Sequence, residues 1–467
     1  MATRHLTLLS RIPKFPELLS RKSTPRPSSL APSPSPRRAS SAGAATTVSM
    51  AKKALVPIAN GTEPLEAVII IDVLRRSGAE VTVASVEDKL QVDACHGVKL
   101  VADALIADCA HIAVDLISLP GGMPGAATLR DCGILEGLVK KQAADGRLYS
   151  AICAAPAVAL GSWGLLKGLK ATCYPSLIEQ LSGTAEAVES RVQQDGRVVT
   201  SRGPGTAMEY SVALVEQLYG KEKADEVAGP LVFSPFLTLT FENRIRLSGP
   251  GNSTWNHLVM RDKHGVDYTI TELNPMPWTY DTCPRILVPI ANGSEEMEAV
   301  IIIDVLRRAK ANVVVASVDD KLEIVASRKV KIVADTSLAE AAKSSYDLIV
   351  LPGGLGGAQA FANSEKLVNM LKKQSEANRP YGAICASPAL VLEAHGLLKG
   401  KKATAFPAMC EKLTDKTEIE NRVVVDGNLI TSRGPGTSME FALAIVEKFF
   451  GREKAQELAK TMLFKHP

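Results

Sequence analysis

Short apolar runs alternate with longer stretches of helical period along the first half of this chain. Runs of four to eight apolar or β-branched residues are typical of strands, and apolar positions spaced three or four apart are typical of helices. The pattern predicts strands at Ala54–Ile58, Glu80–Val86, Asp115–Leu119 and Leu148–Ile152, and helices at Pro64–Ser77, Ala126–Ala144, Ala154–Leu160 and Gly205–Leu218. Asp195-Gly196, inside the segment Arg191–Val199, is a hairpin turn signal. Strands that alternate with helices predict an α/β fold, with a mostly parallel sheet covered on both faces.

The second half of the chain repeats the first. Leu55 to Gly61 returns 232 positions later as Leu287 to Gly293, while Thr200 to Thr206 returns 231 positions later as Thr431 to Thr437. Each copy is roughly 170 residues long, the size of a complete domain rather than of a solenoid unit. We therefore expect two tandem α/β/α domains, at 51–229 and 285–467, joined by a linker or insertion at 230–284.

The linker carries no motif that we can interpret. Phe233–Leu247 is apolar and β-prone, Ser248–Ser253 is loop-like, and Asn274–Asp281 is rich in Pro and Trp. We expect it to contain a strand or two.

The net charge of +4 conceals an uneven distribution. Residues 1–49 hold eight Lys/Arg and one acid, which leaves 46 basic and 49 acidic residues and a net charge of −3 for the rest. This mildly acidic body gives no electrostatic reason to expect binding to nucleic acid or to an anionic membrane. The basic, Ser- and Pro-rich residues 1–50 are typical of a transit peptide, and a disordered tail is the alternative. Its Ser/Pro content favours the chloroplast over the mitochondrion or the cytosol.

The eight cysteines form no Cys-x-x-Cys pair, so the sequence does not predict a zinc site, and we expect no metal. Cys153 and Cys385 are set apart, because each follows a predicted strand and precedes small residues that begin a helix. The N–H groups and dipole of a helix N-terminus favour a thiolate. We interpret the other six cysteines as buried, inert thiols.

Two further elements accompany the cysteine in both copies, all at the carboxyl ends of predicted strands, where ligands bind in parallel sheets. One is an acid in the first helix, Glu66 or Glu298. The acid one turn earlier, Glu63 or Glu295, is interpreted as a cap or a solvent-facing residue. The other is a Gly-Gly turn, at 121–122 or 353–354. Backbone N–H groups near each cysteine can form an oxyanion hole; the candidates are Gly122, Ala154, Gly354 and Ala386.

Four motifs together resemble the ThiJ/PfpI family, in its DJ-one branch, and the tandem arrangement with a basic leader is similar to its plant members. They are Gly61-Thr62-Glu63-Pro64-Leu65-Glu66-Ala67, Leu119-Pro120-Gly121-Gly122, Ala151-Ile152-Cys153-Ala154 and Thr200-Ser201-Arg202-Gly203-Pro204-Gly205-Thr206. The resemblance covers about 52–229 and 285–463. It implies a flavodoxin-like fold in both domains and a cysteine held in a strained elbow, with Glu66 and Glu298 protonated and hydrogen-bonded to the thiolates of Cys153 and Cys385.

The resemblance also implies a glyoxalase- or deglycase-like activity that needs no cofactor. Its substrates would be small 2-oxoaldehydes such as methylglyoxal, which becomes lactate, or early glycation adducts of protein or nucleotide. The alternative is a redox sensor or redox-dependent chaperone that uses the same thiols, since a neighbouring acid also stabilises a sulfinate. Either function would protect against carbonyl and oxidative stress.

The chain departs from the family pattern in one respect. Relatives with glyoxalase activity place a His near the pocket, where this sequence has Tyr174 and Phe406. Tyr174 can donate a hydrogen bond and Phe406 cannot, so we expect weaker turnover in the second copy. Because Ala154 and Ala386 directly follow the cysteines, a Cys-His peptidase is disfavoured.

Family members commonly dimerise, so we expect either an intramolecular pseudo-dimer of the two repeats or a homodimer. The turns Gly203-Pro204 and Gly434-Pro435 would then line the opposite repeat's pocket.

Overall fold

A computed structural model describes residues 51–232 and 270–464. The proposed leader at 1–50, the apolar segment Phe233–Leu247 and the loop-like Ser248–Ser253 lie outside the described residues. Residues 50–467 form one unit, in which both repeats contact each other.

The first repeat is built on a seven-stranded sheet with the order β10-β11-β7-β6-β1-β2-β5. Neighbouring strands run parallel except for the hairpin of β10 and β11, which turns at Gly196 (φ +58°) as the Asp-Gly signal predicts. The strands are β1 (Lys53–Ile58), β2 (Glu80–Ser85), β5 (Ala104–Leu105), β6 (Leu116–Leu119), β7 (Leu148–Ile152), β10 (Val192–Asp195) and β11 (Val198–Ser201). The expected mostly parallel sheet is confirmed.

Helices cover both faces of this sheet and make a three-layer sandwich. They are α1 (Pro64–Arg76), α2 (Gly125–Asp131), α3 (Gly133–Ala144), α4 (Ile178–Ser182), α5 (Ala207–Tyr219) and α6 (Lys221–Ala228). The apolar sides of α1 and α5 fill one core, and those of α2 and α3 fill a second core across the sheet. The prediction of one helix over Ala126–Ala144 is wrong. Cys132 takes an extended conformation (φ −81°, ψ 99°) that ends α2 and begins α3.

The second repeat has the same architecture around an eight-stranded sheet with the order β12-β20-β21-β19-β18-β13-β14-β17. Its strands are β12 (Ile270–Leu273), β13 (Arg285–Ile290), β14 (Asn312–Ser317), β17 (Thr336–Ser337), β18 (Leu348–Leu351), β19 (Tyr381–Ile384), β20 (Val423–Asp426) and β21 (Leu429–Ser432). Its helices are α7 (Glu296–Arg308), α8 (Leu338–Ala341), α9 (Leu355–Asn363), α10 (Glu365–Glu376), α11 (Ser438–Phe450) and α12 (Arg452–Thr461). The two tandem flavodoxin-like domains are therefore present.

The described end of the linker belongs to the second domain. Strand β12 pairs in parallel with β20 along four residues and becomes the edge of the sheet. Trp278 is buried, donates its indole N–H to the Gly427 carbonyl and packs edge-on against Phe449 at 5.2 Å between ring centroids. The chain from Ile270 onward thus adds a strand and an apolar anchor to the second repeat.

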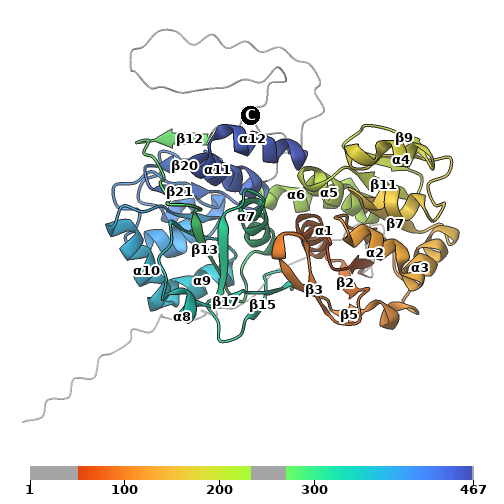
Figure 1. The fold of residues 1–467 in the computed structure, drawn as a ribbon, viewed down its shortest axis with the longest axis horizontal. Coiled ribbons are helices and arrows are strands. Elements are labelled where there is room, and N and C mark those ends of the chain that lie inside the picture. The colour runs from red at the N-terminus through yellow and green to blue at the C-terminus, as the bar shows by residue number, and fades with distance from the viewer. Residues whose placement is uncertain (1–50, 233–269, 465–467) are drawn as a thin grey trace, which may run out of the picture. The chain divides into compact units, whose positions relative to one another are not determined.

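The two repeats pack against each other as the expected pseudo-dimer. Helices α1 and α7 contact each other at the centre of Figure 1. Below them a four-stranded sheet takes two strands from each repeat, in the order β15-β16-β4-β3, with β16 antiparallel to β4. Its strands are β3 (Gln91–Asp93), β4 (Lys99–Val101), β15 (Glu323–Val325) and β16 (Lys331–Val333). One buried apolar core extends through this contact from both repeats.

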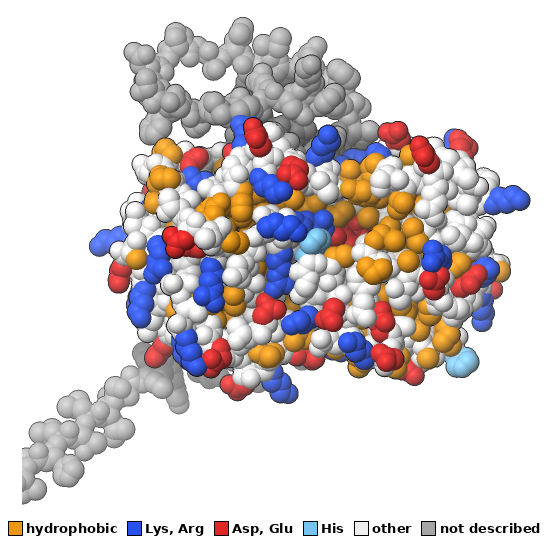
Figure 2. Space-filling view, in the orientation of Figure 1, with side chains coloured by type: hydrophobic (Ala, Val, Ile, Leu, Met, Phe, Trp, Pro, Cys, Tyr) orange, Lys and Arg blue, Asp and Glu red, His pale blue; other side chains and the backbone are white. Residues whose placement is uncertain are grey.

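Acidic and basic side chains are interspersed over the face of the molecule seen in Figure 2, without a region of a single sign. Within residues 51–232 and 270–464, no helix combines the length and apolar content required to traverse a lipid bilayer.

Candidate functional site

Adjacent strands bring the three predicted elements together in each repeat. Strands β7, β6 and β1 are neighbours, and their carboxyl ends lead into Cys153, Gly121 and the turn before α1, respectively. In the second repeat β19, β18 and β13 have the same order and lead into Cys385, Gly353 and the turn before α7. Residues that are far apart in sequence therefore meet at one sheet edge, as the positions of the strand ends predict.

Both cysteines hold a backbone conformation that costs free energy. Cys153 has φ +63° and Cys385 has φ +64°, in the left-handed region that side chains with a Cβ rarely occupy. Hydrogen bonds fix the turn on both sides, since the Cys153 N–H donates to the Ser201 carbonyl (2.9 Å) and the Tyr174 N–H donates to the Cys153 carbonyl (2.8 Å). The strained elbow implied by the resemblance is thus present in both repeats.

The acid of each site is fully buried and held by one of its two oxygens. Glu66 Oε2 accepts a hydrogen bond from the Gly121 N–H at 2.8 Å, and Glu298 Oε2 accepts one from the Gly353 N–H at 2.7 Å. The other oxygen, Oε1, has no hydrogen-bond partner of normal geometry among the described residues in either site. The carboxyl and the sulfur still lie close enough to change each other's pKa. This arrangement leaves Oε1 available to the thiol or to a substrate atom.

Only glycine fits between the cysteine and the acid. A Cβ on Gly121 would lie 2.6 Å from the Cys153 Cβ and 2.9 Å from Glu66 Oε2, and Gly353 would clash in the same way. Gly122 (φ +91°) approaches the backbone before α1 so closely that a Cβ would lie 2.4 Å from the Glu63 nitrogen. The Gly-Gly turn therefore packs the nucleophile against the acid.

Burial decides the electrostatics of the first site. The pKa of Cys153 lies well above its ordinary value because of burial, followed by the charges of Glu66 and Glu63, while the Gly122 N–H opposes the shift as a hydrogen-bond donor to the sulfur. The pKa of Glu66 is also well above its ordinary value, because of burial and then the charge of Glu63. The direction for Cys153 is opposite to the one expected from a helix N-terminus. The charge of Glu66 acts on the thiol only while that acid is ionised, and the raised pKa of Glu66 reduces its ionised fraction.

The second site also combines a buried thiol with a buried acid whose pKa is raised. Burial raises the pKa of Glu298 to about 7, while the Gly353 N–H and the charge of Arg76 lower it. Burial also raises the pKa of Cys385, followed by the charge of Glu298. Cys385 is 8% exposed, whereas Cys153 is half-buried, so a reagent reaches the first thiol more readily.

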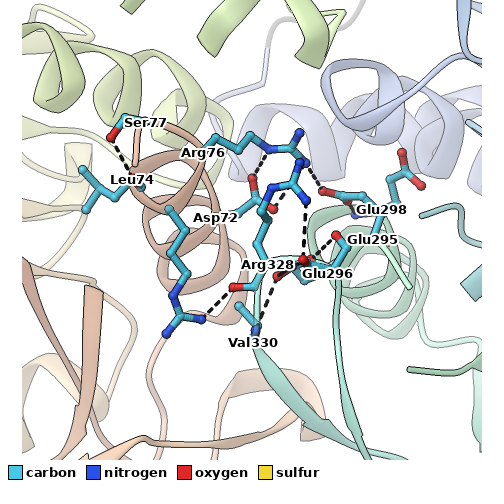
Figure 3. Close-up of polar contacts among 11 residues, drawn as sticks. Asp72, Leu74, Arg76, Ser77, Glu295, Glu296, Glu298, Arg328 and Val330 are labelled. Atoms are coloured by element: carbon cyan, nitrogen blue, oxygen red, sulfur yellow. Dashed lines mark hydrogen bonds and ion pairs between the residues drawn. The ribbon is translucent and has the colours of Figure 1, made fainter. Parts of the chain in front are cut away.

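Each site is also joined to the other repeat by an arginine. Arg76 at the end of α1 bonds its own Asp72 and donates to Glu295 Oε1 at 2.7 Å, and Glu295 in turn accepts from the Glu298 N–H (Figure 3). The mirror-image contacts link Arg308 to Glu63. Glu63 and Glu295 are the N-caps of α1 and α7, which confirms the capping interpretation, but both are buried rather than solvent-facing.

The second repeat adds charges that the first lacks. Glu296 stands where the first repeat has Pro64, and it accepts hydrogen bonds from the Ser327 hydroxyl and the Arg328 N–H, both at 2.8 Å (Figure 3). On the opposite side His96, the counterpart of Arg328, contacts Asp304 at 2.6 Å through Nδ1.

Two groups of side chains place ligand-type atoms within 4.8 Å of one another: Glu63, His96 and Asp304, and Asp72, Glu295 and Glu296. In each group two carboxylates are bound by an arginine, Arg308 or Arg76. Ion pairing with these arginines accounts for the clustering of the acids.

Tyr174 and Phe406, which occupy equivalent positions in the two repeats, have different partners. The Tyr174 hydroxyl donates to the Thr461 carbonyl of the second repeat at 2.9 Å, and Phe406 has no hydroxyl to do so. Gly203 lies against Tyr174 of its own repeat, and Gly434 lies against Phe406 of its own repeat. Each glycine also lies near the other repeat, Gly203 near Leu463 and Gly434 near Val232, and the expectation that the Gly203-Pro204 and Gly434-Pro435 turns line the opposite pocket stays a prediction.

The remaining predicted residues lie beside the nucleophiles. Ala154 and Ala386 follow the cysteines directly and are buried, as are Pro204 and Pro435. The expectation that the six other cysteines are buried is correct for Cys109, Cys173 and Cys410, but Cys95 and Cys132 are only partly buried and Cys283 is exposed.

The sequence did not indicate that Arg76 and Arg308 bind acids of the other repeat. Arg76 and Arg308 read as ordinary basic residues at helix C-termini. The one available signal for these arginines was an acid beside a helix's first turn, such as Glu63. If such a carboxylate is buried, it requires a charged partner.

Comparisons with known proteins agree with the duplicated architecture. The DJ-1/PfpI family model matches residues 52–217 and again residues 284–448. Protein DJ-1 homolog B of Arabidopsis thaliana is 66% identical over 419 residues, which is 90% of this chain and 90% of that protein. Protein DJ-1 homolog A of the same plant is 59% identical over 416 residues, 89% of this chain and 99% of its own length. The glutathione-independent glyoxalase DJR-1.2 of Caenorhabditis elegans is 34% identical over 170 residues, 36% of this chain and 89% of that protein. The chain belongs to the DJ-1/PfpI family and carries two copies of its domain in tandem.

Proposed function

We propose that this protein is a cofactor-independent glyoxalase or deglycase that acts on methylglyoxal or on early glycation adducts of protein or nucleotide. The observation that carries the proposal is a strained cysteine packed against a buried, singly hydrogen-bonded glutamic acid in both repeats. A relative that matches one repeat is described as a glutathione-independent glyoxalase.

The dyad supplies each proton that the reaction needs. Because its pKa is raised, the Cys153 thiol first gives its proton to solvent; the thiolate then adds to the aldehyde carbon of methylglyoxal, and the resulting alkoxide takes the proton of Glu66, giving a hemithioacetal. The Glu66 carboxylate then removes the proton from that carbon and delivers it to the neighbouring carbonyl carbon, which produces a lactoyl thioester. Water hydrolyses the thioester, so that lactate leaves and the thiol is restored. The Gly122 and Ala154 N–H groups stabilise the oxyanions.

The raised pKa of the acid suits this cycle. A carboxyl group with its pKa near 7, as in Glu298, both donates and accepts protons at neutral pH. Burial and the charge of Glu63 also raise the pKa of Glu66, which favours the return of its proton after each turnover.

The test is lactate formation from methylglyoxal by Cys153→Ser, Cys385→Ser and the double variant of the full chain. We expect the first variant to lose most of the activity, because Cys153 is the more exposed thiol. The double variant should be inactive, and Glu66→Gln should resemble Cys153→Ser. Lactate formation by the double variant at the wild-type rate would refute the proposal.

A redox sensor or redox-dependent chaperone is the second candidate, and the free Oε1 of Glu66 favours it. A sulfinate on Cys153 would accept a hydrogen bond from the protonated carboxyl at that oxygen, so the acid would stabilise the oxidised sulfur. Mass spectrometry after mild peroxide treatment should show selective oxidation of Cys153. A protein that oxidises in this way but forms no lactate is a sensor rather than an enzyme.

We propose that residues 1–50 direct the protein to the chloroplast, on the basis of their basic, Ser- and Pro-rich composition. A fluorescent protein fused behind these residues should enter chloroplasts in leaf cells. Accumulation in mitochondria or in the cytosol would contradict the proposal.

A further inference from the structure

The two repeats exchange their final residues. Gly229–Val232, after α6, is the first tail, and Thr461–Phe464, at the end of α12, is the second tail. Val232 and Leu463 are counterparts 231 positions apart, and both have a positive φ, +58° and +59°. A β-branched residue such as Val232 is strained in this conformation, so the surrounding contacts must hold it there.

Hydrogen bonds from the first repeat hold the second tail in place. The Gly205 N–H donates to the Met462 carbonyl at 2.7 Å, and Arg191 Nη1 donates to the Leu463 carbonyl at 3.1 Å. Gly205 must lack a side chain, because a Cβ there would lie 2.4 Å from the Phe464 nitrogen. The approach of the tail to this turn is therefore specific.

The second tail lies beside the first site. The Tyr174 ring packs on Gly203, where an added Cβ would be 3.4 Å from Tyr174 Cδ2 and 3.2 Å from Leu463 Cδ1. Tyr174 in turn is joined to the Cys153 carbonyl by its own N–H. A series of contacts through Tyr174 thus connects the nucleophile, Cys153, with Leu463 in the tail of the other repeat.

The first tail makes the matching contacts at the second site, with one difference. Arg422 Nη1 donates to the Val232 carbonyl at 3.1 Å, and an added Cβ on Gly434 would be 3.3 Å from Phe406 and 3.4 Å from Val232 Cγ2. Phe406 cannot form the bond that Tyr174 makes to its tail. The second site therefore has a smaller tail side chain and lacks a counterpart of the Tyr174 hydrogen bond.

We propose that each tail forms a wall of the other repeat's substrate site and sets the size of the carbonyl compound that the site admits. Leu463, fixed through Tyr174 and Arg191, restricts the Cys153 site to small 2-oxoaldehydes. Val232 leaves the Cys385 site wider along this wall. The inference deepens the proposed function, but access to the thiols can be measured without any turnover.

The test compares alkylation of the intact full-length protein by iodoacetamide and by its bulkier N-benzyl derivative. Quantitative mass spectrometry follows the peptides of Cys153 and Cys385 in the same sample, so each site is the control for the other. In Leu463→Ala, the ratio of bulky to small reagent rates should rise several-fold at Cys153 and stay constant at Cys385. In Val232→Ala, the ratio should rise at Cys385 alone.

A change at both thiols, or at neither, would overturn the inference. Leu463→Val, which copies the first tail, is the conservative variant if Leu463→Ala fails to fold, and it should change the ratio in the same direction by less. Tyr174→Phe removes only the bond to Thr461, and it should also raise the ratio at Cys153 alone.

The substrate arm uses Cys385→Ser, so that only the first site can act. Adding Leu463→Ala should increase kcat/KM for phenylglyoxal relative to methylglyoxal. If the protein makes no lactate at all, the proposed function fails while the alkylation result still decides the role of the tails.

Discussion

Replacing Glu298 with Gln should change how the stability of the protein depends on pH. Gln copies the protonated acid, because its carbonyl oxygen can accept the Gly353 N–H while its amide stays neutral at every pH. The wild-type carboxyl group is fully buried and must be ionised above its pKa of about 7. The two proteins therefore differ in the charge that they bury above neutral pH.

The direction of the change in the free energy of unfolding follows from proton binding. Unfolding returns Glu298 to its ordinary pKa of 4.5, so between pH 4.5 and about 7 the folded state binds more protons than the unfolded state. The free energy of unfolding of the wild type therefore falls as the pH rises through this window. The fall amounts to about 3 kcal/mol, at roughly 1.4 kcal/mol for each pH unit of displacement. The free energy of unfolding of Glu298→Gln does not fall in this way. Relative to the wild type, it should therefore rise by about 3 kcal/mol between pH 4.5 and pH 8.

Urea unfolding at pH 4.5, 6 and 8, followed by circular dichroism and Trp fluorescence, measures this difference. Glu376→Gln, on the exposed side of α10, is the matched control and should track the wild type across the series. A constant difference between Glu298→Gln and the wild type from pH 4.5 to pH 8 would refute the assignment of a raised pKa to Glu298.

Further substitutions test the packing in and around the first site. Gly121→Ala should destabilise the fold and abolish alkylation of Cys153. Its control is Gly137→Ala, on the exposed side of α3, where the added Cβ meets no atom. This control should raise the free energy of unfolding in urea by about 0.5–1 kcal/mol. Arg308→Met leaves the buried Glu63 without its partner and should cost about 3–5 kcal/mol; a loss below about 1 kcal/mol would show that the pair is not buried as described. Cys153→Gly should be more stable than Cys153→Ala by roughly 1–2 kcal/mol, since only glycine is free of strain at φ +63°, and equal stabilities would contradict that strain.

The sequence was sufficient to predict the meeting of nucleophile and acid. Cys153 and Glu66 follow different strands of one parallel sheet, and the carboxyl ends of such strands share an edge. The side of the sheet that each helix covers is fixed by the handedness of the crossovers, so a local pattern implies a long-range contact.

The shift in the thiol's pKa was not accessible in the same way. A helix N-terminus after Cys153 is visible in the sequence and favours a thiolate, but the opposing burial depends on Gly121 and on the packing of α1. Desolvation is a property of the assembled site, so a motif alone cannot give its size.

The contributions across the repeats are harder still to predict. Leu463 lies far from Tyr174 in sequence, and nothing in the pattern around either residue indicates that they meet. The prediction of a pseudo-dimer was correct, but it did not indicate that the turn at Gly203 lies near Leu463 of the other repeat. Symmetry alone defines which surfaces are equivalent, and the side chains define which of them touch.

Duplication within one chain allows the two sites to differ, which is impossible in a dimer of identical subunits. Burial raises the pKa of the second site's acid, Glu298, to about 7; Cys385 is buried, and Val232 of the first tail lies near Gly434. The first site has the more exposed Cys153 and a tail anchored by Tyr174. Because exposure limits the approach of reagents while the acid governs proton transfer, the two copies should differ in both rate and selectivity. An assay of the proposed activity on the whole chain would average the two sites, and variants that remove one cysteine at a time separate them.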